Sequence, residues 1–118
     1  MPDSNQLALA RDARDSRMNK TEAAYAAELE IQLKVGMIVD WAFESHKLRL
    51  ADKTYYTPDF MVITKDREME FHEVKGFWRD DARVKIKVAA ESYPMYRFKA
   101  VQMKRKKDGG GWKVEEFR

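Results

Sequence analysis

Hydrophobic and polar residues repeat with helical spacing in the first patterned segment of the chain. Residues 19–35 are rich in Ala, Glu, Leu and Lys and contain no proline, a composition that favours helix. Ala26, Leu29 and Leu33 are spaced so that they share one side of such a helix. Gly36 stands where a helix C-terminal cap is expected. These features predict a helix over residues 19–35 with one side against the core.

A two-residue alternation then predicts strands. Val39, Trp41 and Phe43 alternate with their neighbours as in a strand with one buried face. Residues 54–63 are β-branched and aromatic but contain Pro58, and proline inside a strand implies an edge, a bend or a bulge. The segments expected as strands are 37–43 (with the short continuation 47–50), 54–63, 68–75, 96–103 and 112–117.

A second helix is expected after these strands. Asp80 or Asp81 can cap it, and it has to end before Pro94. The resulting order is helix-β-β-β-helix-β-β, which predicts an α/β fold with a central mixed β-sheet flanked by helices. Residues 1–18 are polar and predict an N-terminal arm, and residues 19–118 predict one domain.

Composition narrows the function classes. The chain has 118 residues, of which 44% are hydrophobic and 36% charged, as in a globular protein. No apolar run approaches a membrane span or a secretory signal, so we expect no membrane partner and a cytoplasmic location. With no cysteine and two histidines, disulfides, thiolate zinc sites, cysteine nucleophiles and histidine-rich metal sites are excluded. Any metal would be held by oxygen, which favours magnesium, manganese or calcium.

The net charge of +3 and the pI near 9.1 are compatible with a nucleic-acid partner. The basic residues are concentrated late in the chain, where each can also be part of a solvated face. Lys85 or Lys87 can touch a phosphate from the second helix, and the run 104–107 suits contacts to the nucleic-acid backbone. The candidate nucleic-acid-binding residues are Lys85, Lys87, Lys104, Arg105, Lys106 and Lys107.

The candidate chemistry lies on two neighbouring expected strands. Glu73 and Lys75 point to the same face of one strand, and Asp59, at the bent start of the preceding strand, can reach that face. Two close carboxylates are unfavourable without a cation between them. We expect a divalent ion held by Asp59, Glu73 and the carbonyl oxygen of Val74. It would polarise a phosphate and activate water, with Lys75 orienting or deprotonating that water or neutralising developing charge.

The pattern Pro58-Asp59 followed by Glu73-Val74-Lys75 resembles the PD-(D/E)xK superfamily of restriction-endonuclease-like nucleases. The resemblance covers residues 19–103 and includes a helix with a glutamate before the motif and a helix with basic residues after it. It implies a restriction-endonuclease-like core and Mg²⁺ as cofactor, with Mn²⁺ able to substitute. Many members place a further acidic ligand on the first helix, and Glu22 is the matching position.

The segments Asn19-Lys20-Thr21-Glu22-Ala23-Ala24-Tyr25, Tyr56-Thr57-Pro58-Asp59-Phe60 and Glu73-Val74-Lys75-Gly76 look like those of small phage-encoded members. These members are related to phage Holliday-junction resolvases and to end-cutting nucleases of the transposase type. The resemblance implies a homodimer and, for a phage-encoded protein, the cytoplasm of a bacterial host.

Each candidate also has a purely structural interpretation. Glu22 has capping-box spacing from Asn19 and would then only cap the helix. Asp59 can be a turn residue after proline, and Glu73 and Lys75 can form a solvated face. His72 alternates to the other side of its strand and is expected to be structural. For Trp78, packing in the core is favoured over stacking on an unpaired base.

The sequence therefore predicts a metal-dependent DNA endonuclease that recognises branches, flaps or ends rather than a base sequence. Three alternatives stay open: a nuclease subunit that needs a partner for targeting, a non-catalytic nucleic-acid-binding module on the same fold, and an interaction protein that binds no nucleic acid.

Overall fold

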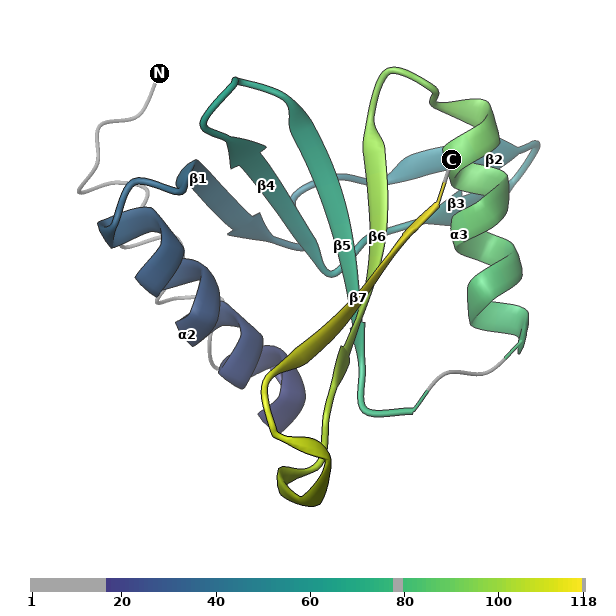
Figure 1. Ribbon diagram of the computed structural model, residues 1–118. Helices are drawn as coiled ribbons and strands as arrows, with labels where there is room; N and C mark the ends of the chain where they lie inside the picture. The colour runs from purple at the N-terminus through teal and green to yellow at the C-terminus, as the bar shows by residue number, and fades with distance from the viewer. Residues whose placement is uncertain (1–16, 78–79, 118) are drawn as a thin grey trace.

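A five-stranded sheet in the order β1-β4-β5-β6-β7 forms the centre of the computed structural model, which describes residues 17–77 and 80–117. The pairs β1–β4 and β4–β5 are antiparallel, β5 and β6 are parallel, and β7 returns antiparallel to β6. The predicted α/β class with a mixed sheet and two α-helices is thus confirmed (Figure 1). The elements of the described residues are α2 (Lys20–Lys34), β1 (Ile38–Phe43), β2 (Leu48–Ala51), β3 (Thr54–Tyr56), β4 (Phe60–Thr64), β5 (Met69–Lys75), α3 (Asp80–Ser92), β6 (Arg97–Met103), a 3₁₀ turn η1 (Lys106–Asp108) and β7 (Trp112–Phe117).

The two α-helices cover opposite faces of the sheet. Leu29 of α2 is fully buried in one cluster with Val74 of β5. Ile86 of α3 belongs to a second cluster with Phe71 of the same strand. Because side chains alternate along a strand, Phe71 and Val74 lie on opposite faces, so β5 is covered by a helix on each side.

The ends of α2 are explained by its sequence. Asn19 is the N-cap, and its side chain accepts a hydrogen bond from the amide of Glu22. The helix ends at Lys34, and Gly36 follows with φ +80°. Glycine adopts this left-handed conformation without the steric cost of a Cβ, so the predicted end of the helix is confirmed.

The segment expected as a strand over residues 54–63, interrupted at Pro58, forms two separate strands, one on each side of that proline. Its first part, β3, pairs only with β2 in a separate two-stranded sheet, and its second part, β4, joins the main sheet. Proline has no amide hydrogen for a strand ladder. Before α3, three strands (β1, β4 and β5) therefore belong to the main sheet, as expected. The other two, β2 and β3, form the separate hairpin, which contacts α3.

Two further predictions are corrected. The register of β1 shifts between Ile38 and Asp40, and a bulge of this kind turns one residue out of the alternation. Val39 is consequently 39% exposed while Ile38 is buried. The second helix begins at Asp80, so this residue and Asp81 lie in its first turn rather than before it. In the first turn their negative charges interact favourably with the positive N-terminal end of the helix dipole.

Within the described residues, no helix combines the length and the apolar character needed to cross a membrane. The arm predicted over residues 1–18 lies, up to residue 16, outside the described residues, and so does Trp78.

Candidate active site

Asp59 is held in place by three hydrogen bonds at the start of β4. Its carbonyl oxygen accepts from the amide of Glu44 at 2.8 Å, and its Oδ2 accepts from the amide of Val74 at 2.8 Å. Its own amide donates to Oε1 of Glu73 at 3.1 Å. The two carboxylates predicted to meet are therefore side by side, joined through main-chain groups of each other's strand.

Glu73 is contacted on both carboxylate oxygens. The hydroxyl of Tyr56 donates to Oε1 at 3.0 Å, and Nζ of Lys75 lies 3.6 Å from Oε2. The Glu73 side chain is 12% exposed, whereas that of Lys75 is 40% exposed. Lys75 thus links a nearly buried carboxylate to solvent. Tyr56, at the end of β3, was not expected as a site residue, and its 17-residue separation from Glu73 is closed by the antiparallel pairing of β4 with β5.

Burial raises the pKa values of both carboxyl groups, and repulsion by Glu73 adds to the effect at Asp59. Burial is the largest cause for Asp59, the charge of Glu73 is the next, and together they raise the pKa of Asp59 to about 8 although the amide of Val74 lowers it. Burial also raises the pKa of Glu73, against the opposing effects of Lys75, Tyr56 and the Asp59 amide. Two such groups are unfavourable together as anions, and a bound cation would relieve this.

A groove of about 610 Å³ opens beside this pair, between the β2–β3 hairpin, β5 and α3. Glu73 and Lys75 line it from β5, and Lys85 lines it from α3. Of the two lysines considered for a phosphate contact, Lys85 lines the same groove as Glu73. The lining residues are Leu50, Ala51, Thr54, Tyr56, Thr57, Glu73, Lys75, Asp81, Ala82, Val84, Lys85 and Val88.

The donor atoms at the site are oxygens, as a hard divalent ion requires. Asp59 and Glu73 offer carboxylates, and the amide of Val74 points at Asp59. In an extended strand the amide and carbonyl of one residue face the same neighbour, so the Val74 carbonyl also faces the edge where Asp59 lies. Among the described residues no three His, Cys, Asp or Glu side chains gather as a metal-binding group. The fit to Mg²⁺ or Mn²⁺ therefore rests on two carboxylates and this carbonyl.

Glu22 does not complete the set. Its Oε1 accepts a hydrogen bond from the amide of Asn19 at 2.9 Å, and Oδ1 of Asn19 accepts from the amide of Glu22 at 2.8 Å. This is the capping box that the spacing allowed. The charge of Glu22 still raises the pKa of Asp59, so the start of α2 lies close enough to influence the pair.

The other basic candidates lie apart from the groove. Lys87 lines a different depression with Arg83 and Phe117, since two residues along a helix point to different sides. Lys104 and Arg105 follow the end of β6 and line a groove with Gly76 and Phe77, which follow the end of β5. Lys106 and Lys107 lie in η1, in the exposed connection to β7.

His72 lies on the opposite face of β5, as predicted. Its Nε2 is 2.9 Å from Oε1 of Glu70, and its Nδ1 is 2.6 Å from the hydroxyl of Tyr25. Since the carboxylate can only accept, Nε2 carries the proton and Tyr25 donates to Nδ1. Burial lowers the pKa of His72. These contacts place the histidine in a hydrogen-bonded core on the α2 side.

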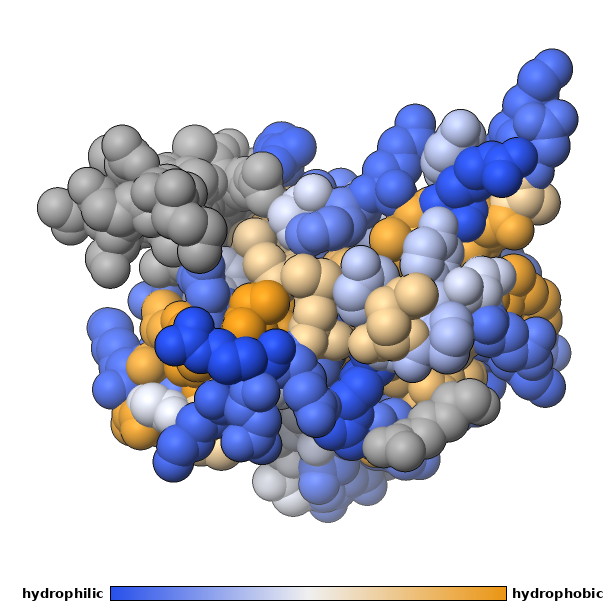
Figure 2. Space-filling model, turned by 90° about the horizontal axis from the view of Figure 1, so that it is seen from above, coloured by the Kyte–Doolittle hydropathy of each residue, from blue (hydrophilic) through white to orange (hydrophobic). Residues whose placement is uncertain are grey.

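The opposite end of the sheet carries another groove, of about 770 Å³, lined by charged and apolar residues. This end faces the viewer in Figure 2, where hydrophilic side chains surround apolar ones. Arg97, in that groove, is bound to Glu116 at 2.7 Å and to Glu68 at 3.2 Å. Its charge is thus compensated within the protein, which makes this end a weaker candidate than the carboxylate pair.

No family model matches the sequence, and the searches of curated proteins and of solved structures likewise found no match.

Proposed function

We propose that the protein is a metal-dependent DNA endonuclease with a restriction-endonuclease-like core of the PD-(D/E)xK kind. The observation that supports this most is the pairing of Asp59 and Glu73. Both are nearly buried, both have raised pKa values, and Lys75 lies beside them at the edge of an open groove. Packing alone does not account for two carboxylates held at one point, whereas an ion-dependent hydrolase requires them.

In the proposed mechanism Asp59, Glu73 and the Val74 carbonyl would hold Mg²⁺, or Mn²⁺ in its place. The bound ion supplies Lewis acidity toward a phosphate oxygen and lowers the pKa of water. Lys75, 3.6 Å from Glu73, orients the attacking water and offsets charge that develops on the phosphate. The hydrogen bond from Tyr56 opposes the rise in the pKa of Glu73 and so favours the ionised carboxylate. Hydrolysis of one phosphodiester bond leaves a phosphomonoester and a free hydroxyl group.

The proposed substrate is branched or duplex DNA recognised by its shape. The basic side chains near the site are suited to phosphates, and such contacts position the nucleic acid without reading its sequence. Lys85 reaches the catalytic groove itself. A phage origin and a homodimer belong to the proposal on the strength of the motif resemblance.

Cleavage of a labelled panel tests the proposal. Four-way junctions, flaps, duplexes and single strands are incubated with Mg²⁺ or Mn²⁺, with EDTA as the metal-free control. We expect metal-dependent cleavage that falls by about 10²- to 10⁴-fold in Asp59→Asn, Glu73→Gln and Lys75→Ala. Lys65→Ala, an exposed lysine in the β4–β5 turn, is the matched control and should cleave normally.

Two results would contradict the proposal. One is the absence of cleavage on every substrate; retained tight binding to DNA would then favour a partner-dependent subunit or a binding module. The other is equal cleavage by wild type and all three site variants, which would indicate a contaminating nuclease. Circular dichroism of each variant separates loss of chemistry from loss of fold.

A further inference from the structure

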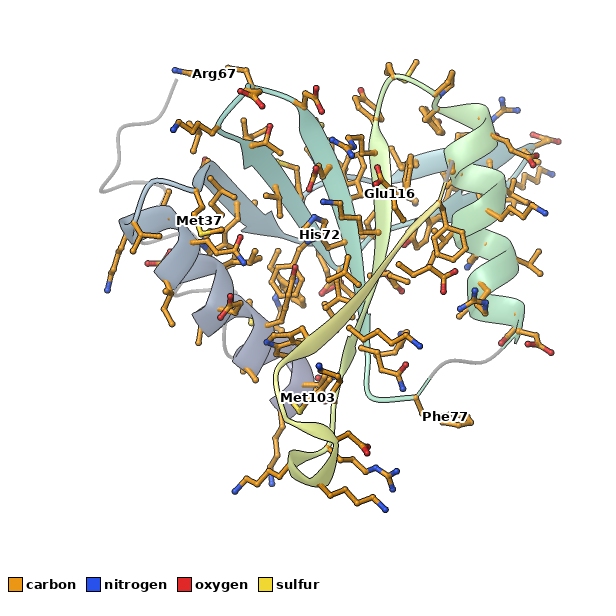
Figure 3. The ribbon with its side chains drawn as sticks, in the orientation of Figure 1. Met37, Arg67, His72, Phe77, Met103 and Glu116 are labelled. Atoms are coloured by element: carbon orange, nitrogen blue, oxygen red, sulfur yellow. The ribbon has the colours of Figure 1, made fainter. Side chains whose placement is uncertain are left out.

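Phe77 is the most exposed of the large hydrophobic side chains in the described residues, at 76%. It follows the end of β5 by two residues and projects away from the ribbon at the lower end of the sheet (Figure 3). Exposing a full aromatic ring has a free-energy cost that burial against a partner removes. The position of this ring in the fold therefore indicates what partner it suits.

Phe77 lies in a groove of about 510 Å³ that the catalytic residues do not share. Besides the residues after β5, its lining comes from the end of β6 and from the hairpin that leads through η1 into β7. The lining residues are Gly76, Phe77, Gln102, Met103, Lys104, Arg105, Asp108 and Lys113. The groove thus combines an exposed aromatic ring with a predominantly basic wall.

The charge of this wall is positive. Lys104, Lys113 and Arg105 line it together with a single carboxylate, Asp108. That carboxylate accepts a hydrogen bond from Nε of Arg105 at 3.2 Å, so these two charges compensate each other. The two lysines therefore make the net charge of the groove positive. Such a surface is complementary to phosphates.

The groove begins where the catalytic groove ends. Lys75, in the catalytic groove, pairs with Gln102 across β5 and β6. Gln102 also donates from Nε2 to the carbonyl of Gly76 at 3.3 Å, which ties the chain after β5 to β6. Phe77 is two residues from Lys75, a span of at most about 7 Å.

We propose that this second groove binds a single-stranded segment of DNA, with the ring of Phe77 stacked on an unpaired base and Lys104 and Lys113 on the adjoining phosphates. Bases within a duplex are already stacked on one another, so only an unpaired base can offer its face to the ring. The inference deepens the proposed function, on which it rests for the identity of the substrate. It assigns the enzyme to substrates in which unpaired nucleotides adjoin the bond to be cut.

Binding without cleavage tests the inference. Fluorescence anisotropy measures the affinity of the full chain, in EDTA, for a labelled oligothymidine and for a duplex of equal length. We expect Phe77→Ala to weaken single-strand binding by about 5- to 100-fold and duplex binding by less than about 2-fold. Phe77→Trp, which keeps an aromatic face, should bind the single strand like wild type. Met95→Ala, 67% exposed at the other end of the sheet, is the matched control.

The lysines give an independent reading. Substitution of Lys104 and Lys113 by Gln should lower the salt dependence of single-strand binding by about 0.7 in log K per log salt for each contact removed. An unchanged salt dependence would overturn the assignment of these lysines to phosphates. Equal affinity of Phe77→Ala and wild type for the single strand would overturn the stacking site, and would leave the groove to a protein partner.

Failure of the inference and failure of the nuclease proposal give different results. If wild type cleaves DNA and Phe77→Ala binds and cleaves every substrate equally well, the inference is wrong and the nuclease stands. If no DNA is cleaved but single-strand binding depends on Phe77, the groove assignment stands and the nuclease proposal is wrong.

Discussion

The main-chain amide of Asp59 donates a hydrogen bond to the carboxylate of Glu73 across 3.1 Å. This bond fixes the distance between two acidic residues that are 14 positions apart in the chain. The reciprocal bond from Val74 to Oδ2 of Asp59 at 2.8 Å holds the other carboxylate. The pair is thus positioned by backbone groups, which do not move with side-chain rotation, and its repulsion is built into the fold.

That repulsion predicts an unusual dependence of stability on pH in metal-free protein. The pKa of Asp59 is about 8 when folded and 3.8 ordinarily, so the folded state holds this proton more tightly. The contribution is fully present below about pH 4 and is lost as pH rises toward about 8. We expect Asp59→Asn to flatten this part of the thermal-melting profile and to melt higher than wild type above about pH 8. Asp66→Asn, in an exposed turn, should leave the profile unchanged.

Added Mg²⁺ should offset, in wild type, the loss of stability that ionisation of Asp59 causes at high pH. Metal that binds only the folded state stabilises it by about 2.7 kcal/mol at one hundred times its dissociation constant. Calorimetry at pH 8 should show this increase in wild type and its loss in Asp59→Asn. An equal increase in both proteins would show that the metal binds elsewhere.

The hydroxyl of Tyr56 should set the lower end of the pH range of cleavage. Its hydrogen bond to Glu73 lowers the pKa of that carboxyl group, so Tyr56→Phe should raise this pKa. We expect the acid limb of the pH–rate profile to move to higher pH and the rate at neutral pH to fall about 10-fold. Tyr55→Phe, the exposed neighbour, is the control. A uniform loss of rate without a shift along the pH axis would mean that Tyr56 acts through packing alone.

Glu22 can be tested for its capping role. The capping box predicts that Glu22→Ala lowers the free energy of unfolding by about 1 kcal/mol. Glu22→Gln keeps an oxygen that accepts from the Asn19 amide, so it should keep most of the stability and cleave within a few-fold of wild type. Urea denaturation and a cleavage assay on the same samples measure both. A stable Glu22→Gln protein that no longer cleaves would instead assign Glu22 to the metal.

Tyr25 should matter for stability and not for chemistry. Tyr25→Phe removes the donor to Nδ1 of His72 and leaves a buried acceptor without a partner, at a cost of about 1–3 kcal/mol. Because the pKa of His72 is lowered in the folded protein, the unfolded chain takes up the proton first as pH falls. The stabilising effect of the buried neutral histidine is therefore present above about pH 6.5 and is lost below it. Urea denaturation at pH 7 and pH 5 measures both effects, and a change below about 0.5 kcal/mol would contradict the first.

Local pattern was sufficient wherever one stretch of chain determined the outcome. The glycine at position 36 ends α2, because a left-handed residue stops a helix wherever it occurs in the fold. Strand alternation placed Glu73 and Lys75 on one face and His72 on the other, because successive side chains of any strand point to opposite sides. The proximity of Asp59 to Glu73 followed from the expectation that their two strands are adjacent.

Contacts between distant segments were decided only by the tertiary structure. The division of residues 54–63 depends on β2, which pairs with the first part, and on β1 and β5, which pair with the second. The bulge that exposes Val39 depends on the register with β4. Periodicity could not tell Lys85 from Lys87, because both lie on one helix and only its docking angle sends one into the catalytic groove. The sequence by itself determined which residue types share a face, since this is a property of the backbone period. Tertiary packing determined which faces meet, because it depends on distant contacts that no local window contains.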